Sequence, residues 1–305
     1  MFWNKTNKEE LLNSRIKELS EQVKELRYII TNYITPHDIK VVKNELRQKQ
    51  LVILELLKIF DYICKKSKIE YWLAYGSLLG AVRHNGFIPW DDDVDIGMMR
   101  SDYNRFISLS KKDLDSVDCY INYDKAFDDP IVRLCSKKIS GVQIDIFPHD
   151  QYYKKMDIED QILFNKKRKI AHTSLLEAYK KESFVSESEF ETKLELLSKK
   201  ITKQIVLEEH EIDPNGSIFC GIEFDCVDLI DPTYLFPLKT ISFEGYEFKC
   251  PNNPQGFLKD LYGDYSRWPQ KLFRHGSQRI FNEFDSNLEK DYLTFKGIVS
   301  SYINQ

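Results

Sequence analysis

The chain has 305 residues, 42% of them apolar, which is enough for one large or two modest domains with a buried core. Its 44 basic and 48 acidic residues leave a net charge of −4, so the overall charge gives no support to nucleic-acid binding. No apolar run approaches the roughly 18 residues of a membrane span, and the first residues lack the apolar stretch of a signal peptide. We therefore expect a cytoplasmic protein, with peripheral contact at the inner face of the membrane left open.

Apolar residues near the N-terminus recur at alternating steps of four and three, with Lys, Glu and Arg in most of the gaps. They are Leu12, Ile16, Leu19, Val23, Leu26, Ile30 and Tyr33. This spacing predicts a coiled-coil helix through which the chain forms a homo-oligomer. The alternative is an amphipathic helix folded back on the main domain. Because Pro36 disfavours helical geometry at the residue before it, we place the boundary between this helix, 1–36, and the main domain, 37–305, there.

The main domain alternates between helical and strand-like patterns, which predicts an α+β fold. Strands are expected over residues 71–75, 94–98, 119–123, 131–135 and 142–147, followed by a hairpin over 240–249. Helices are expected over residues 46–66, 77–83, 255–262 and 277–290. Residues 157–210 are strongly charged but keep one apolar stripe, so we expect an inserted helical lobe there.

Six cysteines are spaced irregularly along the chain, at Cys64, Cys119, Cys135, Cys220, Cys226 and Cys250. They are too sparse for a disulfide scaffold. The five residues between Cys220 and Cys226 are more than structural zinc sites usually have. We expect reduced, buried thiols.

The densest chemical signal is a run of four aspartates within five residues, at Asp91, Asp92, Asp93 and Asp95. Since Val94 and Ile96 set the phase of a strand, Asp93 and Asp95 should share its other face. Two carboxylates about 4 Å apart repel each other by roughly 4 kcal/mol at an effective dielectric constant near 20. A sheet therefore rarely places them together without a cation, and oxygen ligands favour Mg²⁺ or Mn²⁺. The alternative is a solvated acidic turn.

Upstream of these acids, Gly76 and Ser77 end a predicted strand and open a helix. Backbone N–H groups and the Ser77 hydroxyl at such a helix start can bind an anion, although an ordinary helix cap has the same sequence. A phosphate-binding turn followed by an Asp-x-Asp metal site is what phosphoryl transfer requires.

A third acid, Asp145, lies alone between Ile144 and Ile146 in a strand-like run. An isolated buried carboxylate is costly, so we predict that Asp145 completes the metal site and activates the attacking hydroxyl. The alternative is a hydrogen-bonded structural Asp at a strand end. His149 and Asp150 follow with no evident role.

Three segments together closely resemble the LicD family, which includes bacterial phosphocholine transferases and is related to the fukutin-type proteins. They are GSLLGAVRHNGFIPWDDDVDIGM at 76–98, IDIFP at 144–148 and LYGDY at 261–265. The resemblance implies a nucleotidyltransferase-like fold, with a small mixed β-sheet flanked by helices. By the resemblance, Gly76 and Ser77 match the family's phosphate-binding turn. Asp93 and Asp95 match its metal pair, and Asp145 matches its third acid.

The implied reaction moves a phospho-alcohol from a CDP-linked donor to a hydroxyl of a cell-surface glycan and releases CMP. Phosphocholine is the phospho-alcohol that we expect first. Ribitol, glycerol and ethanolamine stay open as the alcohol, and capsule, teichoic acid and lipopolysaccharide as the acceptor. One alternative is a nucleotidyltransferase that releases pyrophosphate. The other is a catalytically inactive coiled-coil assembly protein.

Further residues of the matched segments have less definite roles. Arg83 is expected either to bind the donor's diphosphate or to pair with a nearby aspartate. Phe87 and Trp90 are expected to pack, although either ring could stack on cytosine. His275 stands where family members often carry a histidine, and its role is unassigned, as are those of Asp91 and Asp92.

Overall fold

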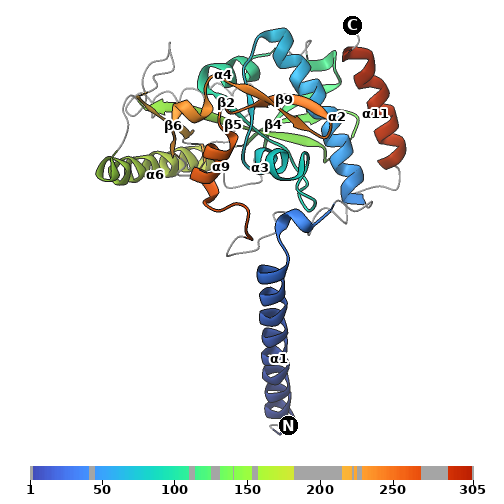
Figure 1. Cartoon of the computed structure of the whole chain (residues 1–305), viewed down its shortest axis with the longest axis vertical. Helices are drawn as coiled ribbons and strands as arrows, with labels where there is room; N and C mark the ends of the chain where they lie inside the picture. The colour runs from blue at the N-terminus through green and yellow to red at the C-terminus, as the bar shows by residue number, and fades with distance from the viewer. Residues whose placement is uncertain are drawn as a thin grey trace.

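The computed structural model describes residues 3–40, 45–109, 114–124, 131–139, 141–152, 157–181, 215–221, 223–224, 229–268 and 288–303. A body built around a β-sheet carries one long helix, α1, which projects away from it (Figure 1). Among the described helices, none is both long enough and apolar enough to cross a bilayer.

Helix α1 spans Trp3–Tyr33, and a short 3-10 helix at Pro36–Asp38 follows it. α1 makes no extended contact with any other described helix or strand. Its apolar residues are largely exposed, from 45% for Leu19 to 73% for Tyr33. The helix is therefore not folded back on the body, and self-association stays a prediction.

The central sheet is mixed, as expected. Its strands are β1 Trp72–Leu73, β2 Asp95–Met99, β3 Cys119–Asp124, β4 Ile131–Ser136, β5 Gln143–Tyr152, β6 Ser217–Cys220 and β7 Leu229–Ile230. The order is β1-β2-β5-β4-β3, while β6 pairs with the second half of β5 and β7 pairs with β6. β2 and β5 are parallel, and the other pairs are antiparallel.

Helices cover the sheet and extend the body. They are α2 Glu45–Ser67, α3 Tyr75–His84, α4 Arg100–Ile107, α6 Ile158–Lys181, α8 Pro232–Leu235, α9 Pro254–Tyr262 and α11 Leu288–Ile303. α2 packs on β4 and β5, and α11 lies beside α2 (Figure 1). The predicted apolar face of α2 is confirmed, since Leu56, Ile59 and Phe60 are fully buried.

The predicted hairpin is confirmed as β8 Lys239–Phe243 and β9 Tyr246–Cys250. Its turn residues Glu244 and Gly245 both have positive φ, 53° and 80°, as a two-residue hairpin turn requires.

Other predicted elements differ in length or lie partly outside the described residues. The strand expected over 71–75 has only two residues, because Tyr75 already begins α3. β5 continues past the expected end at residue 147 because β6 pairs with its second half. α6 confirms helix in the first part of the expected lobe, whereas residues 182–214, residues 269–287 and Cys226 lie outside the described chain. None of the five described cysteines forms a disulfide, and all five are buried.

A buried ion cluster joins α4 to β5 and gives Asp150 a structural role. Arg100 donates to both carboxylate oxygens of Asp150, at 2.9 and 2.6 Å, and to both of Glu223, at 2.6 and 2.9 Å. The carboxylate side chains are each 2% exposed. The cluster fixes α4, which begins where β2 ends, against the neighbouring strand.

We expect Arg100→Met to lower the free energy of unfolding by about 3–5 kcal/mol, because it leaves two buried carboxylates unpaired. Urea unfolding measures the loss. The control, Arg267→Met, removes a side chain that is 82% exposed and should cost less than about 0.5 kcal/mol. Equal losses in the two variants would contradict a buried, paired role for Arg100.

Candidate active site

Three acids meet where β2 and β5 run parallel. Asp95 and Asp145 are direct neighbours in the register, and Asp93 precedes β2. One carboxylate oxygen from each of Asp93, Asp95 and Asp145 lies within 4.8 Å of the others. Val94 and Ile96 are fully buried, as the predicted strand phase requires. The structure thus brings the three predicted site acids together, and their binding of a metal stays a prediction.

The acidic run contributes a second cluster that shares Asp93. Carboxylate oxygens of Asp91, Asp92 and Asp93 also lie within 4.8 Å of one another. Asp91 reaches so close to the start of α3 that a Cβ on Gly76 would lie 2.9 Å from its Oδ2. A side chain at position 76 would therefore displace the Asp91 carboxylate.

Burial, together with the crowding of like charges, dominates the electrostatics of the site. Burial raises the pKa of Asp95 well above its ordinary value, and the charges of Asp93, Asp145 and Asp91 raise it further. Burial and Asp93 likewise raise the pKa of Asp91. Without a cation the site therefore favours protons on its carboxyl groups, and a bound divalent cation would compete with those protons.

A buried arginine, Arg133, pairs with Asp145 and was not found by sequence analysis. It lies opposite Asp145 in the register of β4 and β5, and its Nε donates to Asp145 Oδ1 at 2.7 Å. Arg133 is 3% exposed. Its sequence signal is the same as that of Asp145, a lone charged residue between apolar neighbours in a strand.

Helix α2 holds the acidic run through two further residues that sequence analysis missed. Lys49 pairs with Asp92 at 2.9 Å. Gln50, fully buried, donates to the main-chain oxygens of Asp91 at 2.8 Å and Ile88 at 3.2 Å. The sequence signal that could have identified Lys49 and Gln50 is their position as polar residues on the otherwise apolar face of α2. These contacts set the path of the loop that carries the aspartates.

Gly76 and Ser77 are tied directly to Asp95. The Gly76 N–H donates to Asp95 Oδ2 at 3.2 Å, and the Asp95 N–H donates to Ser77 Oγ at 2.8 Å. Tyr75, the first residue of α3, has a φ of 40°, an uncommon value outside glycine. The turn therefore positions an acid of the site, and its binding of phosphate stays a prediction.

The segment LYGDY contacts the site region through Arg83. Arg83 donates to the main-chain oxygen of Tyr265 at 3.1 Å and to His84 at 3.0 Å. Burial lowers its pKa, and the charge of Asp91 partly offsets that effect. Binding of the donor's diphosphate by Arg83 stays a prediction, and His275 lies outside the described chain.

Phe87 and Trp90 have different surroundings. Phe87 is buried against Phe243, with ring centroids 4.9 Å apart, as its predicted packing requires. Trp90 is half-buried and stacks on Trp268, with ring centroids 5.3 Å apart and planes at 25°. The Trp268 indole N–H donates to the main-chain oxygen of Ile34, just beyond α1, at 2.7 Å.

His149 is fully buried, with its ring against Trp72 at a centroid distance of 4.9 Å. Its Nδ1 lies 3.1 Å from the main-chain oxygen of Phe147. Burial lowers the pKa of His149 to about 4, so the ring is neutral at physiological pH. It serves packing rather than acid–base chemistry at the acids.

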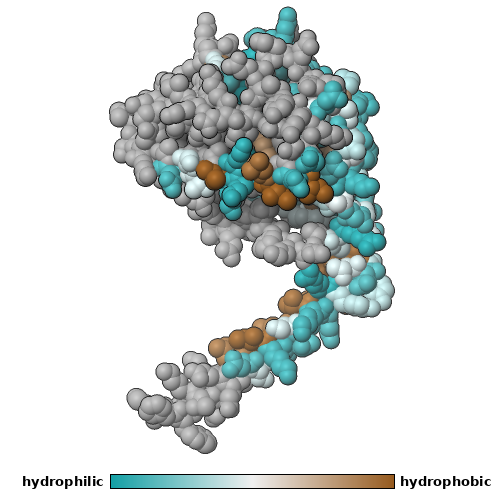
Figure 2. Space-filling view, turned by 90° about the vertical axis from the view of Figure 1, so that its left-hand side faces the viewer, coloured by the Kyte–Doolittle hydropathy of each residue, from teal (hydrophilic) through white to brown (hydrophobic). Residues whose placement is uncertain are grey.

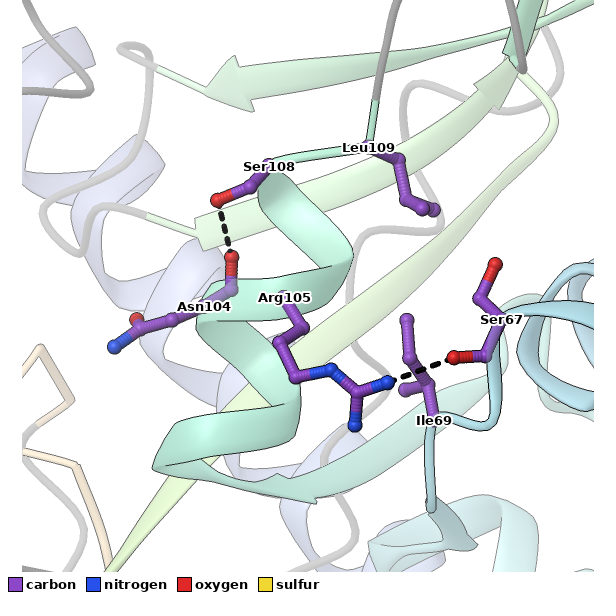
Figure 3. A pocket seen from close by; sticks show the side chains of 6 residues that line it. All are labelled: Ser67, Ile69, Asn104, Arg105, Ser108 and Leu109. Atoms are coloured by element: carbon purple, nitrogen blue, oxygen red, sulfur yellow. Dashed lines mark hydrogen bonds between the residues drawn. The ribbon is translucent and has the colours of Figure 1, made fainter.

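A shallow pocket of about 360 Å³ lies elsewhere (Figure 3). Its lining residues are Ser67, Ile69, Asn104, Arg105, Ser108 and Leu109. Arg105 donates to the main-chain oxygens of Ser67 at 2.7 Å and Lys68 at 3.1 Å, so its charge ties α4 to the end of α2. None of the predicted site residues lines this pocket.

A small mixed sheet that joins acids on two neighbouring parallel strands to a Gly-Ser helix start defines a nucleotidyltransferase-like domain. Residues 68–191 match the model of the LicD/FKTN/FKRP nucleotidyltransferase domain. This segment is a LicD-family domain, as the sequence motifs predict.

Individual relatives agree with this assignment. Lipopolysaccharide cholinephosphotransferase LicD of Haemophilus influenzae is 51% identical over 67 residues, which are 22% of this chain and 25% of that protein. Human ribitol 5-phosphate transferase FKRP is 32% identical over 88 residues, 28% of this chain and 18% of that protein. An uncharacterized Rickettsia prowazekii protein is 24% identical over 261 residues, 85% of this chain and 71% of that protein. The matches to the two named transferases thus span a quarter or less of their lengths.

Charge crowding predicts that Asp95→Asn stabilises the metal-free protein. Because the folded-state pKa of Asp95 is raised, its ionisation opposes folding above its unfolded pKa near 4 and has no effect well below it. In excess chelator at pH 7 we expect about 1 kcal/mol of added stability, falling towards zero by pH 3, measured by urea unfolding.

Asp145→Asn is the matched contrast, because Asp145 pairs with Arg133. It should destabilise the protein, since it removes the negative charge that pairs with a buried guanidinium. The same sign of change in both variants would contradict the distinction between a crowded and a paired carboxylate.

Proposed function

We propose that the protein is a Mg²⁺-dependent transferase that moves phosphocholine from a CDP-linked donor to a hydroxyl of a cell-surface glycan and releases CMP. The observation that carries the proposal is the meeting of Asp93, Asp95 and Asp145 beside the start of α3. The LicD and FKRP relatives, named for choline phosphate and ribitol phosphate transfer, support a phospho-alcohol as the transferred group.

The donor set suits a hard divalent cation. Among the described residues, carboxylate oxygens converge in two groups, one of Asp93, Asp95 and Asp145 and the other of Asp91, Asp92 and Asp93. Oxygen ligands of this kind favour Mg²⁺ or Mn²⁺ over metals that prefer nitrogen or sulfur. When bound, the ion would neutralise charge on the diphosphate as the transferred phosphoryl group moves.

The reaction forms one phosphorus–oxygen bond and breaks another. The acceptor hydroxyl oxygen bonds to the phosphorus that carries the alcohol, and the bond from that phosphorus to the CMP oxygen breaks. The hydroxyl proton passes to a carboxylate of the cluster, for which we propose Asp145. Arg133 donates to Asp145 Oδ1 and thereby orients the carboxylate for this step.

Choline is the favoured alcohol because aromatic rings adjoin the acids. Phe147 lies two residues beyond Asp145 and is half-buried, and its ring contacts Tyr75 at a centroid distance of 4.9 Å and Phe224 at 4.7 Å. Aromatic faces attract quaternary ammonium groups, whereas a neutral polyol such as ribitol gains nothing comparable.

We expect Asp93→Asn and Asp145→Ala each to lower turnover at least 100-fold, because each removes a group that acts in the transition state. The assay measures CMP release from CDP-choline with Mg²⁺ and a glycan acceptor. Calorimetry should show that Asp145→Ala still binds the donor. The control, Asp260→Asn on the exposed side of α9, should keep full activity.

Several results would contradict the proposal. Full wild-type activity in excess chelator would exclude the metal. Release of pyrophosphate from CTP, with no release of CMP from a CDP-linked alcohol, would indicate a nucleotidyltransferase. No turnover with any of the CDP-linked alcohols choline, ribitol, glycerol and ethanolamine would favour an assembly protein.

The position of the Phe147 ring leads to a separate prediction about the alcohol. Phe147→Leu should lower kcat/KM about tenfold with CDP-choline but less than about threefold with CDP-ribitol. Phe243→Leu, a substitution in the core beside Phe87, should affect both donors equally. Equal losses with both donors in Phe147→Leu would contradict recognition of the ammonium group by this ring.

A further inference from the structure

An apolar seam on α1 faces away from any described partner. The seam consists of Leu12, Ile16, Leu19, Val23, Leu26, Ile30 and Tyr33. Six of its seven side chains are 45–73% exposed, and only Ile30 is half-buried. Figure 2 shows hydrophobic residues along one side of the helix and polar residues on the other. A continuous stripe of this kind on a helix that stands alone is costly in water.

The residue types along the seam specify more than self-association. In heptad terms, Ile16, Val23 and Ile30 occupy successive a positions, and all three are β-branched. The d positions are Leu12, Leu19, Leu26 and Tyr33, so all but the last are leucine. β-Branched residues at a with leucine at d favour two parallel strands over three or four.

The flanks of the seam are compatible with an identical partner. In a parallel pair, Arg15 of one chain would face Ser20 of the other, and Gln22 would face Arg27, so like charges do not meet. The charged pair Glu21 and Lys24, at 3.2 Å, lies on the side away from the seam.

We propose that a second copy of this chain covers the seam, and that the two α1 helices form a parallel two-stranded coiled coil. Both bodies then lie at the same end of the coil. An antiparallel pair would instead separate the two junctions by about 32 Å of helix, at 1.5 Å per residue.

The junction between α1 and the body gives the parallel arrangement a functional consequence. The Ile34 main-chain oxygen accepts a hydrogen bond from Trp268, which stacks on Trp90 beside the acidic run. Each coil strand therefore enters its body next to a candidate site, and two sites stand near one another. Two linked sites raise the local concentration of enzyme on a polymeric acceptor without any change in either site.

The first test is the mass of the full chain in solution at about 10 micromolar, by light scattering and sedimentation equilibrium. We expect twice the chain mass. Leu19→Glu and Val23→Glu should give the single-chain mass, because each places a charge in the seam. Ser14→Glu adds the same charge at an exposed f position outside the seam and should leave the pair intact.

Cysteine cross-linking tests the orientation, with the wild-type chain as background. In a parallel pair, Leu12→Cys and Tyr33→Cys each cross-link to themselves, because equal positions face each other. In an antiparallel pair, neither does so alone, and only a mixture of the two variants cross-links.

A single-chain mass for the wild type, a three-chain mass, or cross-linking only in the mixture would each overturn the proposal. CMP release on a short acceptor is a separate readout. We expect Val23→Glu to lose pairing but keep normal turnover. The solution mass therefore tests the coiled coil, and CMP release separately tests the proposed reaction.

Discussion

The structure depends on the close approach of carboxylates at the junction of β2 and β5. Each of these groups is stable in water, but burial and mutual repulsion oppose their ionisation here, as the raised pKa values of Asp91 and Asp95 reflect. The surrounding residues hold this arrangement in place. Arg133 pairs with Asp145, Lys49 pairs with Asp92, and the Gly76 N–H binds Asp95. This crowding of buried acids is the feature on which the proposed cation site rests.

The groups that hold the acids come from a larger part of the chain than the family segment at 68–191. Lys49 and Gln50 lie before it on α2, and Tyr265 and Trp268 lie after it. The β8–β9 turn adds a further support, because Glu244 accepts from Arg47 at 2.6 Å and from the Phe87 N–H at 3.1 Å. The candidate site therefore depends on contacts from several parts of the described body.

Helix α1 and the body have different physical organisations. In the body, helices and sheet bury one another's apolar faces, and the buried side chain of Gln50 is hydrogen-bonded inside it. Helix α1 has no such internal partner in the described chain, and its apolar residues stay exposed. Packing within one chain accounts for the body, whereas the seam of α1 stays exposed in a single chain, and we propose that a second chain covers it.

The sequence by itself determined the three acids and most of the elements around them, although α4, β6, β7 and α8 were not predicted. Short-range patterns suffice for these features, because strand phase places Asp93 and Asp95 on one face and a lone charge in an apolar strand marks Asp145. Only the tertiary structure decided which distant residues serve the site. The pairing of Arg133 with Asp145 depends on the register of two strands, and the contact of Lys49 with Asp92 depends on how α2 packs. Tyr75 was assigned to a strand because its aromatic side chain suits one, but the start of α3 holds it at a φ of 40°. These features result from long-range packing, which no local pattern in the sequence specifies.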